Sequence, residues 1–315
     1  NTLKVVRPES GFLNAGEASG VLVQNDDVYF ASYYSETGDG QVTSNDWYAR
    51  EAGTLGNSLR LEVCPSATAY EQDLGVGNLV NGAGAVGDTT ITVDDADASG
   101  FAFQVGDMIK FHTNDSITAT SNGAITTASI NLTVDANSGT IAVGNRVIAA
   151  GIDEVVTVKT VTSQTALILD KAITIADNVS MAFSTYASVE DGNKEYEVTA
   201  INSEVLSIRL KDDADSGGLQ TIIPDNSFIT RRWRFSDRFD GAPRTSAWNT
   251  QNGRGAGDEI HVVVFDGTGD ITGFKVDVAG QRTAAIIETY GNLSKNPSAK
   301  GPQGDSIYYP TVFFN

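Results

Sequence analysis

The sequence predicts a mainly β protein of several domains with few short helices, and three observations predict it. Its 315 residues suffice for two or three domains with a sizeable core. Short β-branched or alternating apolar segments follow one another between Gly, Asn and Asp residues, and 32 glycines serve as turn formers. The middle of the chain also repeats one strand pattern. We therefore expect a mixed, strand-rich α+β body that carries small inserted β-barrel or β-sandwich modules.

The N-terminal segment combines two expected strands with the best helical candidate of the chain. Residues 3–7 and 59–64 have strand character, and the second stretch alternates apolar and polar side chains up to Cys64. Residues 44–51 begin with residues that cap helices and precede Gly53, which predicts a short helix. Cys64 is the single cysteine, so it can form no internal disulfide, and its place in the alternation predicts a buried side chain.

Residues 81–212 hold an internal repeat whose second copy is nested inside the first. Each copy contains a strand, a loop, a Val-Gly-polar turn, another strand and then a strand pair. The outer copy runs through residues 87–109 and closes with strands at 196–201 and 205–210, and the inner copy runs through residues 129–148 and closes with strands at 155–161 and 165–169. About four short strands per copy are enough for a small barrel or sandwich.

This repeat sets the expected domain boundaries. Residues 1–80 and 213–315 should form the body, and residues 81–212 the inserted modules, with the outer copy at about 85–112 plus 190–212 and the inner copy at about 128–185. Insertions are tolerated at exposed loops, so the modules should project from the body. They carry 17 acidic and 7 basic side chains, which predicts an acidic outer module.

The C-terminal segment contains the most apolar stretch. The side chains of residues 231–235 alternate as expected for a strand. Residues 260–265 form a nearly continuous apolar run typical of a strand buried on both faces. Residues 266–269 have the chemistry of a hairpin turn, and residues 285–290 fit a further strand better than a helix.

Charge and hydropathy narrow the classes of partner. The chain has 40 acidic and 21 basic residues, a net charge of −19 and a pI of about 4.3, so it repels nucleic acid phosphates and anionic membranes. No apolar run approaches the roughly 18 residues of a membrane span, and the start lacks the pattern of a signal peptide. We expect no nucleic acid partner and no membrane insertion. The non-Met start and the apolar end suggest a piece of a longer polypeptide.

The histidines and carboxylates show no catalytic spacing. His112 and His261 are the only histidines, and neither belongs to a zinc-protease helix motif or a nucleophile elbow. Asp258 and Glu259 precede His261 at the start of the apolar strand, where we expect His261 to be a hydrogen-bonding residue. We predict no catalytic, cofactor-binding or metal-binding residue and a chain that is not an enzyme. A paired-carboxylate hydrolase stays open, because sequence does not show which carboxylates converge.

Three further stretches are expected to be turns. The Asp-rich segments 95–100 and 213–217 resemble calcium loops but lack the late bidentate Glu, since Gly106 and Pro224 stand at its place. The glycine-rich segment 253–258 precedes a strand, whereas a phosphate cradle precedes a helix.

A cluster of arginines is the best candidate for an interface. Arg232 and Arg234 share one face of the expected strand, and Arg231 shares the other with Trp233. In a chain this acidic, the planar guanidinium groups suit carboxylates of a neighbouring subunit or domain better than nucleic acid. The predicted interface residues are Arg231, Arg232, Arg234 and Arg238.

Two stretches near the ends of the chain resemble one known family. The sequence "WYAREAGTLGNSLRLEVC" at residues 47–64 is similar to a segment of contractile phage tail sheath proteins, with Ala52 in place of an expected Pro. The stretch "GDEIHVVVFDGTGDITG", followed by "AIIETYGNLSKNPSAKGPQGDSIYYPTVFFN", resembles the hairpin, the continuing strand and the Tyr-Tyr segment of the same family. "NTLKVVRPES" is similar to the strand before the first stretch. The nested repeat is outside the resemblance.

The resemblance implies a structural subunit of a bacteriophage tail sheath. Such a subunit polymerises helically with copies of itself around the tail tube, and contraction drives the tube through the host envelope for genome ejection. Contacts with the tail tube protein, the baseplate and the tail terminator would then involve regions outside this chain, and the protein would reside in the virion after assembly in the host cytoplasm. The alternative is a host-surface or glycan-binding β-module, because small repeated barrels can bind sugars through polar loops.

Overall fold

The computed structural model describes most of the chain from residue 58 onward. The described residues are 58–74, 78–95, 103–152, 154–189, 194–211, 217–267, 269–273 and 285–314, with the backbone of two short antiparallel strand pairs, β1 (Leu3–Lys4) with β2 (Leu22–Val23) and β17 (Lys275–Val276) with β18 (Arg282–Thr283). The predicted mainly β, multi-sheet fold is confirmed. The helix expected at 44–51 lies outside the described residues.

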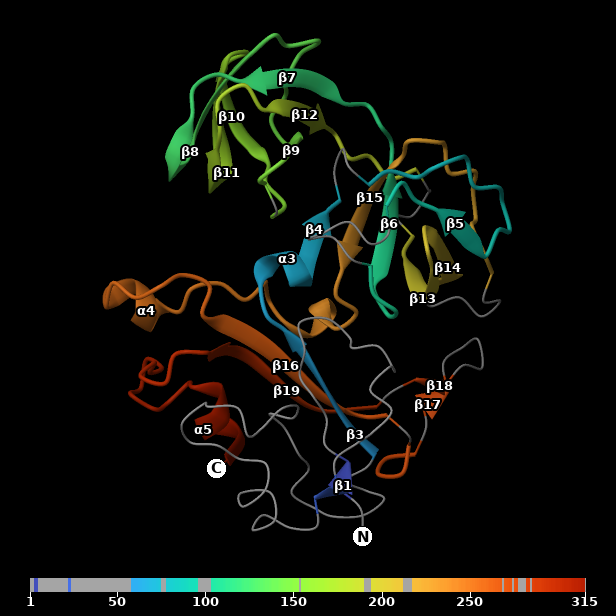
Figure 1. Cartoon of the computed structure of the whole chain (residues 1–315), viewed down its shortest axis with the longest axis vertical. Helices are drawn as coiled ribbons and strands as arrows, with labels where there is room; N and C mark the ends of the chain where they lie inside the picture. Colours follow the sequence, from blue (N-terminus) through green and yellow to red (C-terminus); the bar gives the residue numbers. More distant parts are fainter. Residues whose placement is uncertain are drawn as a thin grey trace. The chain divides into compact units, whose positions relative to one another are not determined.

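The chain divides into two compact units, one of residues 1–70 with 235–315 and one of residues 71–234. The second unit contains two six-stranded sheets, visible in Figure 1 as β4–β6 with β13–β15 and as β7–β12. We call the part built on the first sheet the outer module and the part built on the second sheet, residues 117–184, the inner module.

The outer module is an antiparallel sheet that curls around its own core. Its strand order is β4 (Glu71–Asp73), β15 (Phe228–Arg232), β6 (Met108–His112), β13 (Tyr196–Asn202), β14 (Val205–Leu210) and β5 (Thr90–Thr92). Isolated bridges pair Val80 with Val93 and Gly84 with Ile223, in the segments that flank β5 and precede β15. Fully buried side chains such as Ile109, Tyr196 and Leu206 fill the interior. β4 and β15, whose residues were expected in the body, are thus strands of this sheet.

The inner module has a second core of the same kind. Its strand order is β10 (Val158–Ser163), β11 (Ala166–Ile175), β8 (Ile125–Asp135), β7 (Ile117–Ser121), β12 (Ser180–Ser184) and β9 (Arg146–Ala149). A bridge from Arg146 to Thr157 joins β9 to the segment that enters β10. Leu132, Val134 and Phe183 are buried at its centre.

The two modules share one pattern of hydrogen bonds around the Val-Gly-polar turn. In the outer module the N–H of Gly106 donates to the carbonyl of Val198 at 2.7 Å, and in the inner module Gly144 donates to Val158 at 2.8 Å. The side chains of Asp107 and Asn145 each accept the N–H three residues earlier, at 2.8 and 2.7 Å. The two turns therefore occupy equivalent places.

Nesting follows from this equivalence. β6 and β13 of the outer module pair directly, yet the whole inner module lies between them in the chain. The equivalent strands of the inner module, β9 and β10, are connected by residues 150–157 alone. The inner module thus replaces one short loop of the outer module, which is where an insertion disturbs a β core least.

The first unit contains a three-stranded antiparallel sheet ordered β19 (Ala285–Ser294), β16 (Glu259–Asp266) and β3 (Leu59–Cys64). Its remaining described elements are short: α3 (Ala67–Tyr70), η2 (Ser236–Arg238), α4 (Ala247–Gln251) and α5 (Tyr309–Phe314). Val262 and Val263 of the central strand are fully buried, as the apolar run predicts, and Cys64 is buried too. No helix within the described ranges has the length and apolar character needed to cross a membrane.

Candidate functional site

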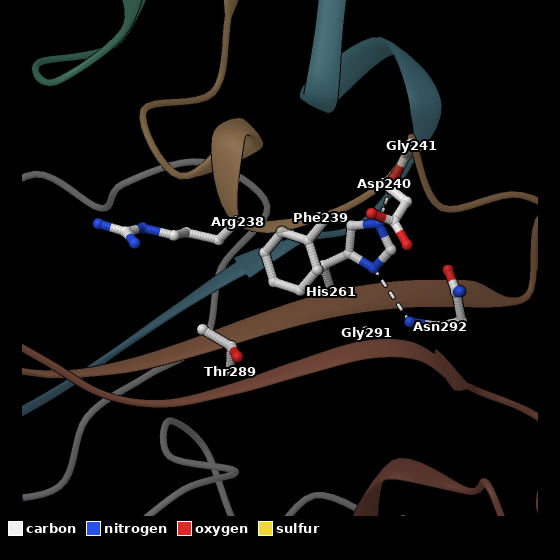
Figure 2. Close-up of a pocket in the computed structure, with 8 residues that line it drawn as sticks. All are labelled: Arg238, Phe239, Asp240, Gly241, His261, Thr289, Gly291 and Asn292. Carbon is white, nitrogen blue, oxygen red and sulfur yellow. Dashed lines mark hydrogen bonds between the residues drawn. The ribbon is translucent and has the colours of Figure 1, made fainter.

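His261 occupies a closely packed site on β16 (Figure 2). Its ring stacks on Phe239 with centroids 4.2 Å apart and planes at 6°, and it meets Tyr70 edge-on at 6.0 Å. Nε2 lies 2.7 Å from the carbonyl oxygen of Gly241, and Nδ1 lies 3.0 Å from the backbone N of Asn292. Because a carbonyl only accepts, Nε2 carries the proton and Nδ1 accepts the Asn292 N–H. Both nitrogens of a neutral imidazole are thereby used.

A bulge in the sheet creates this arrangement. Ile260 pairs with Leu293 but Val262 pairs with Tyr290, so Gly291 and Asn292 together oppose His261. Such a bulge removes ladder partners from the backbone, and the imidazole supplies one of them. Burial also lowers the pKa of His261 below its ordinary value. The predicted hydrogen-bonding role of His261 is confirmed.

A polar hollow of about 230 Å³ opens beside this histidine. Figure 2 shows the exposed Arg238 side chain extending away from His261, while Asp240 and Asn292 border the imidazole. The hollow is lined by Arg238, Phe239, Asp240, Gly241, His261, Thr289, Gly291 and Asn292.

The two carboxylates before His261 serve different neighbours. Asp258 accepts the backbone N–H of Ser246, the N-cap of α4, at 2.8 Å, and it also accepts the hydroxyl of Ser294 on β19. Burial alone would raise the pKa of Asp258, but these hydrogen bonds outweigh it and lower the pKa. Glu259 accepts the backbone N–H of Arg244 at 3.0 Å. The side chains of the Asp-Glu-Ile-His stretch therefore bind neighbouring loops and strands to the start of β16.

Asp266 ends β16 and orders the turn that follows it. β16 pairs with β19 and β3, and the next strand, β17, pairs with β18, so the hairpin expected at residues 266–269 is wrong. It accepts N–H groups of Gly269 at 2.8 Å and Thr272 at 2.8 Å, and it also accepts the hydroxyl of Ser58. Burial acts to raise the pKa of Asp266, yet these hydrogen bonds hold it well below the usual range. The carboxylate thus stays ionised and orders the turn.

Metal ligands do not gather among the described residues, which contain no cluster of three or more His, Cys, Asp or Glu side chains suited to an ion. The Asp-rich segments 95–100 and 213–217 lie almost entirely outside the described residues. The glycine-rich segment 253–258 forms a turn after α4 and leads into β16, as expected.

Two of the four predicted interface arginines find carboxylates inside the same unit. Arg231 is buried, with Nη1 3.3 Å from Asp107 Oδ2 and Nη2 3.3 Å from Gln72 Oε1. Burial raises the pKa of Asp107, and the charge of Arg231 opposes that shift. Arg232 forms a two-pronged ion pair with Glu195.

Glu195 gathers two more cations, Lys110 at 3.4 Å and Lys211 at 3.2 Å. Arg234 lies against the Gly106 turn, where a Cβ on the glycine would stand 3.2 Å from its Cδ. Arg238 is exposed on η2 at the hollow. Contact of the four arginines with another subunit stays a prediction, and Arg238 is the most accessible of them.

A cluster that sequence reasoning did not find lies between the outer and inner modules. Tyr186 adopts a left-handed backbone conformation with φ of 51°, uncommon for a bulky residue. Its ring stacks on Phe228 at 5.2 Å and meets His112 at 4.5 Å, and the guanidinium of Arg146 lies 4.9 Å from its centroid. Arg146 also forms an ion pair with Asp73. No local pattern marks these residues, because they come from segments far apart in the chain.

Comparisons with protein-family models, with curated proteins and with solved structures find no match to this chain.

Proposed function

We propose that the chain is part of a structural subunit of a contractile phage tail sheath. The observation that carries the proposal is the pairing of β3 with β16, which runs from His261 opposite Cys64 to Asp266 opposite Leu59. These strands belong to the two stretches that resemble sheath proteins, although nearly two hundred residues separate them. Two independent local resemblances that fold into neighbouring strands support one common origin better than chance similarity of unrelated loops.

The two modules fit an accessory role in such a subunit. Each buries its own apolar core and the cluster around Tyr186 joins the two, so the pair can move as one rigid body when subunits repack. Sheath contraction requires one set of subunit contacts to be exchanged for another. Exposed ion pairs contribute only about 0 to 1 kcal/mol each and suit that exchange, and a net charge of −19 keeps free subunits apart in solution.

Under this proposal the main partner is a second copy of the protein, in a helical assembly. The tail tube protein, baseplate and tail terminator would be further partners, bound through regions outside this chain, and the assembled protein would reside in the virion.

Electron microscopy of the longest natural polypeptide that contains this chain tests the proposal. The expected result is tubes or stacked rings with helical order, at protein concentrations where a control of the isolated residues 71–234 stays monomeric. Persistent monomers across salt and pH would contradict a sheath role.

A further inference from the structure

A chain of hydrogen bonds runs from Tyr186, in the segment that leaves the inner module, through buried groups of the outer module. His112 Nδ1 lies 2.9 Å from the carbonyl oxygen of Tyr186, and His112 Nε2 lies 2.9 Å from the hydroxyl of Thr230. The same hydroxyl lies 3.2 Å from Asp73 Oδ1. The side chain of Asp73 is 7% exposed, and His112 and Thr230 are each 5% exposed, so water does not readily substitute for a missing partner.

Counting protons along this chain gives an unexpected result. The Tyr186 carbonyl only accepts, so Nδ1 of His112 must carry a hydrogen, and Nε2 of a neutral ring must then accept the Thr230 hydroxyl. That hydroxyl has a single hydrogen, so it has none left for Asp73. All three contacts are hydrogen bonds only if one more proton is present, either on Asp73 or on Nε2 of His112.

We propose that in mildly acidic solution the module junction holds one proton on Asp73, as a neutral carboxylic acid that donates to Thr230 beside a neutral His112, in place of the ion pair that ionised Asp73 forms with Arg146. The proton sits at the contact of the two modules, so its release leaves two acceptors competing for one hydroxyl hydrogen and weakens the junction. This proton site is independent of any role in sheath assembly.

The surroundings favour the carboxyl group over the imidazole. Burial raises the pKa of Asp73 to about 6, against the opposing charge of Arg146 and with the help of Glu71. Burial, with the charges of Arg146 and Lys110, lowers the pKa of His112 to about 4 against the opposing hydrogen bond to the Tyr186 carbonyl.

A buried oxygen without a hydrogen-bond partner also favours a neutral Asp73. Asp73 Oδ2 and the hydroxyl oxygen of Tyr186 are buried without a hydrogen-bond partner. An oxygen of a neutral acid costs less in that position than an oxygen of a carboxylate.

Nitrogen NMR of the full chain labelled at histidine tests where the proton lies. The chain has only two histidines, and they should show opposite neutral tautomers, His112 with hydrogen on Nδ1 and His261 with hydrogen on Nε2. His112 should keep this form from pH 7 down to about pH 5. An imidazolium signal from His112 at pH 6, or hydrogen on Nε2 of both rings, would overturn the proposal.

Unfolding of the Asp73→Asn variant provides a second test. The amide nitrogen can donate to Thr230 as the acid does, but at that position it no longer accepts from Arg146 Nη1, so the variant should fold with a stability loss that does not depend on pH in this range. Below about pH 6 the wild-type folding constant should rise relative to the variant by up to about tenfold per pH unit, because folded Asp73 then binds a proton that the unfolded chain does not. Asp240→Asn, at an exposed carboxylate, should keep the wild-type profile. Parallel profiles of wild type and Asp73→Asn would refute the proton site.

Discussion

The two histidines of this protein meet a similar demand with opposite tautomers. Each ring is buried beside a backbone carbonyl, Gly241 for His261 and Tyr186 for His112, and each donates its one hydrogen there. The second nitrogen then faces a donor, the Asn292 N–H in one case and the Thr230 hydroxyl in the other. A histidine in an apolar strand therefore indicates a local hydrogen-bonding need as readily as a chemical one.

Replacing His112 with Gln should change the pH dependence of stability. Burial holds the pKa of His112 at about 4, below its ordinary 6.5, so its contribution is present above pH 6.5 and is lost as the pH falls towards 4. The wild type should exceed the variant most at pH 7, with the gap shrinking by up to about tenfold in the folding constant per pH unit. Urea unfolding between pH 7 and 4 measures this.

Asp73 has the opposite sign, since its raised pKa adds stability as the pH falls below about 6. The contributions of these two groups therefore have opposite slopes and offset each other, while carboxyl groups such as Asp107 and Glu195 add slopes of their own that both variants share with the wild type. A gap between wild type and His112→Gln that widens on acidification would contradict the assignment.

The sequence predicted the chemical type of the arginine partners but not which residues they are. Their composition predicts carboxylate partners, and Asp107 and Glu195 are such partners for Arg231 and Arg232. Which carboxylates these are follows from the pairing of β15 with β6 and of β6 with β13. Periodicity along one strand contains no information about the neighbouring strand.

At the scale of elements, the Val-Gly-polar turn is the feature that the two modules share most closely. A third example, Val86-Gly87-Asp88, occurs in the outer module, where the Asp88 side chain accepts the N–H of Ala85 at 2.8 Å. The glycines of the three turns have φ of 89°, 98° and 89°, a conformation that other residues adopt at a cost. The valines of these turns are exposed, Val143 to 64%, so the turn conformation depends on the glycine and the polar residue and not on packing of the valine.

Gly144→Ala tests this view of the turn. The added Cβ meets no atom within 4 Å, so its effect should come from the backbone conformation alone. We expect a loss of about 1 to 2 kcal/mol in the free energy of unfolding. Gly255→Ala is the control, because its Cβ also meets nothing within 4 Å and its φ is not positive. Equal stability of both variants would show that the turn tolerates a side chain.

Several elements with apolar periodicity were predicted, but β7 (Ile117–Ser121) and β12 (Ser180–Ser184) of the inner module were not among the expected strands. β14 occupies residues 205–210 as expected, and β16 extends the expected 260–265 by one residue at each end. β4 has the sequence Glu-Gln-Asp, which contains no apolar residue, and it is a strand because β15 pairs with it. The strand expected at 231–235 is β15 at 228–232, since the chain leaves the sheet before η2.

At the scale of the whole molecule, nesting makes the inner module dispensable for the outer fold. The outer core consists of side chains from residues outside 113–193, apart from Val189 packed at its margin. The inner module contributes Ile148 and Ala182 to the contact, and Tyr186 from the segment after it joins them against Leu79 and Phe228 of the outer module.

Replacing residues 113–193 with a copy of residues 151–153, which occupy the equivalent position in the inner copy, should therefore leave a folded protein. Phe228→Thr would accompany the excision, because the phenylalanine loses its cover. We expect a β-type circular dichroism spectrum and a cooperative thermal transition. A chain without such a transition would show that the outer module depends on its insert.

Arg238→Glu tests the predicted interface in the full-length polypeptide. Of the four arginines it is exposed on η2 beside the hollow, where a carboxylate of a second copy has access. Reversal of its charge should reduce sheath-like polymers in sedimentation and microscopy. Arg254→Glu, at an exposed turn of the same unit, is the matched control and should assemble normally. Equal assembly of both variants would remove Arg238 from the interface, whereas absence of wild-type polymers would instead count against the sheath role.

The sequence by itself determined the β class, the positions of several apolar strands, the nested repeat and the burial of Cys64, because each depends on local periodicity or turn chemistry. Only the tertiary structure decided that β3 and β16 are neighbours, that Arg231 and Arg232 meet carboxylates of their own unit, and that Asp73, Thr230 and His112 form one chain of hydrogen bonds. The physical reason is that such contacts depend on the register between strands distant in sequence, and the packing of the whole core sets that register.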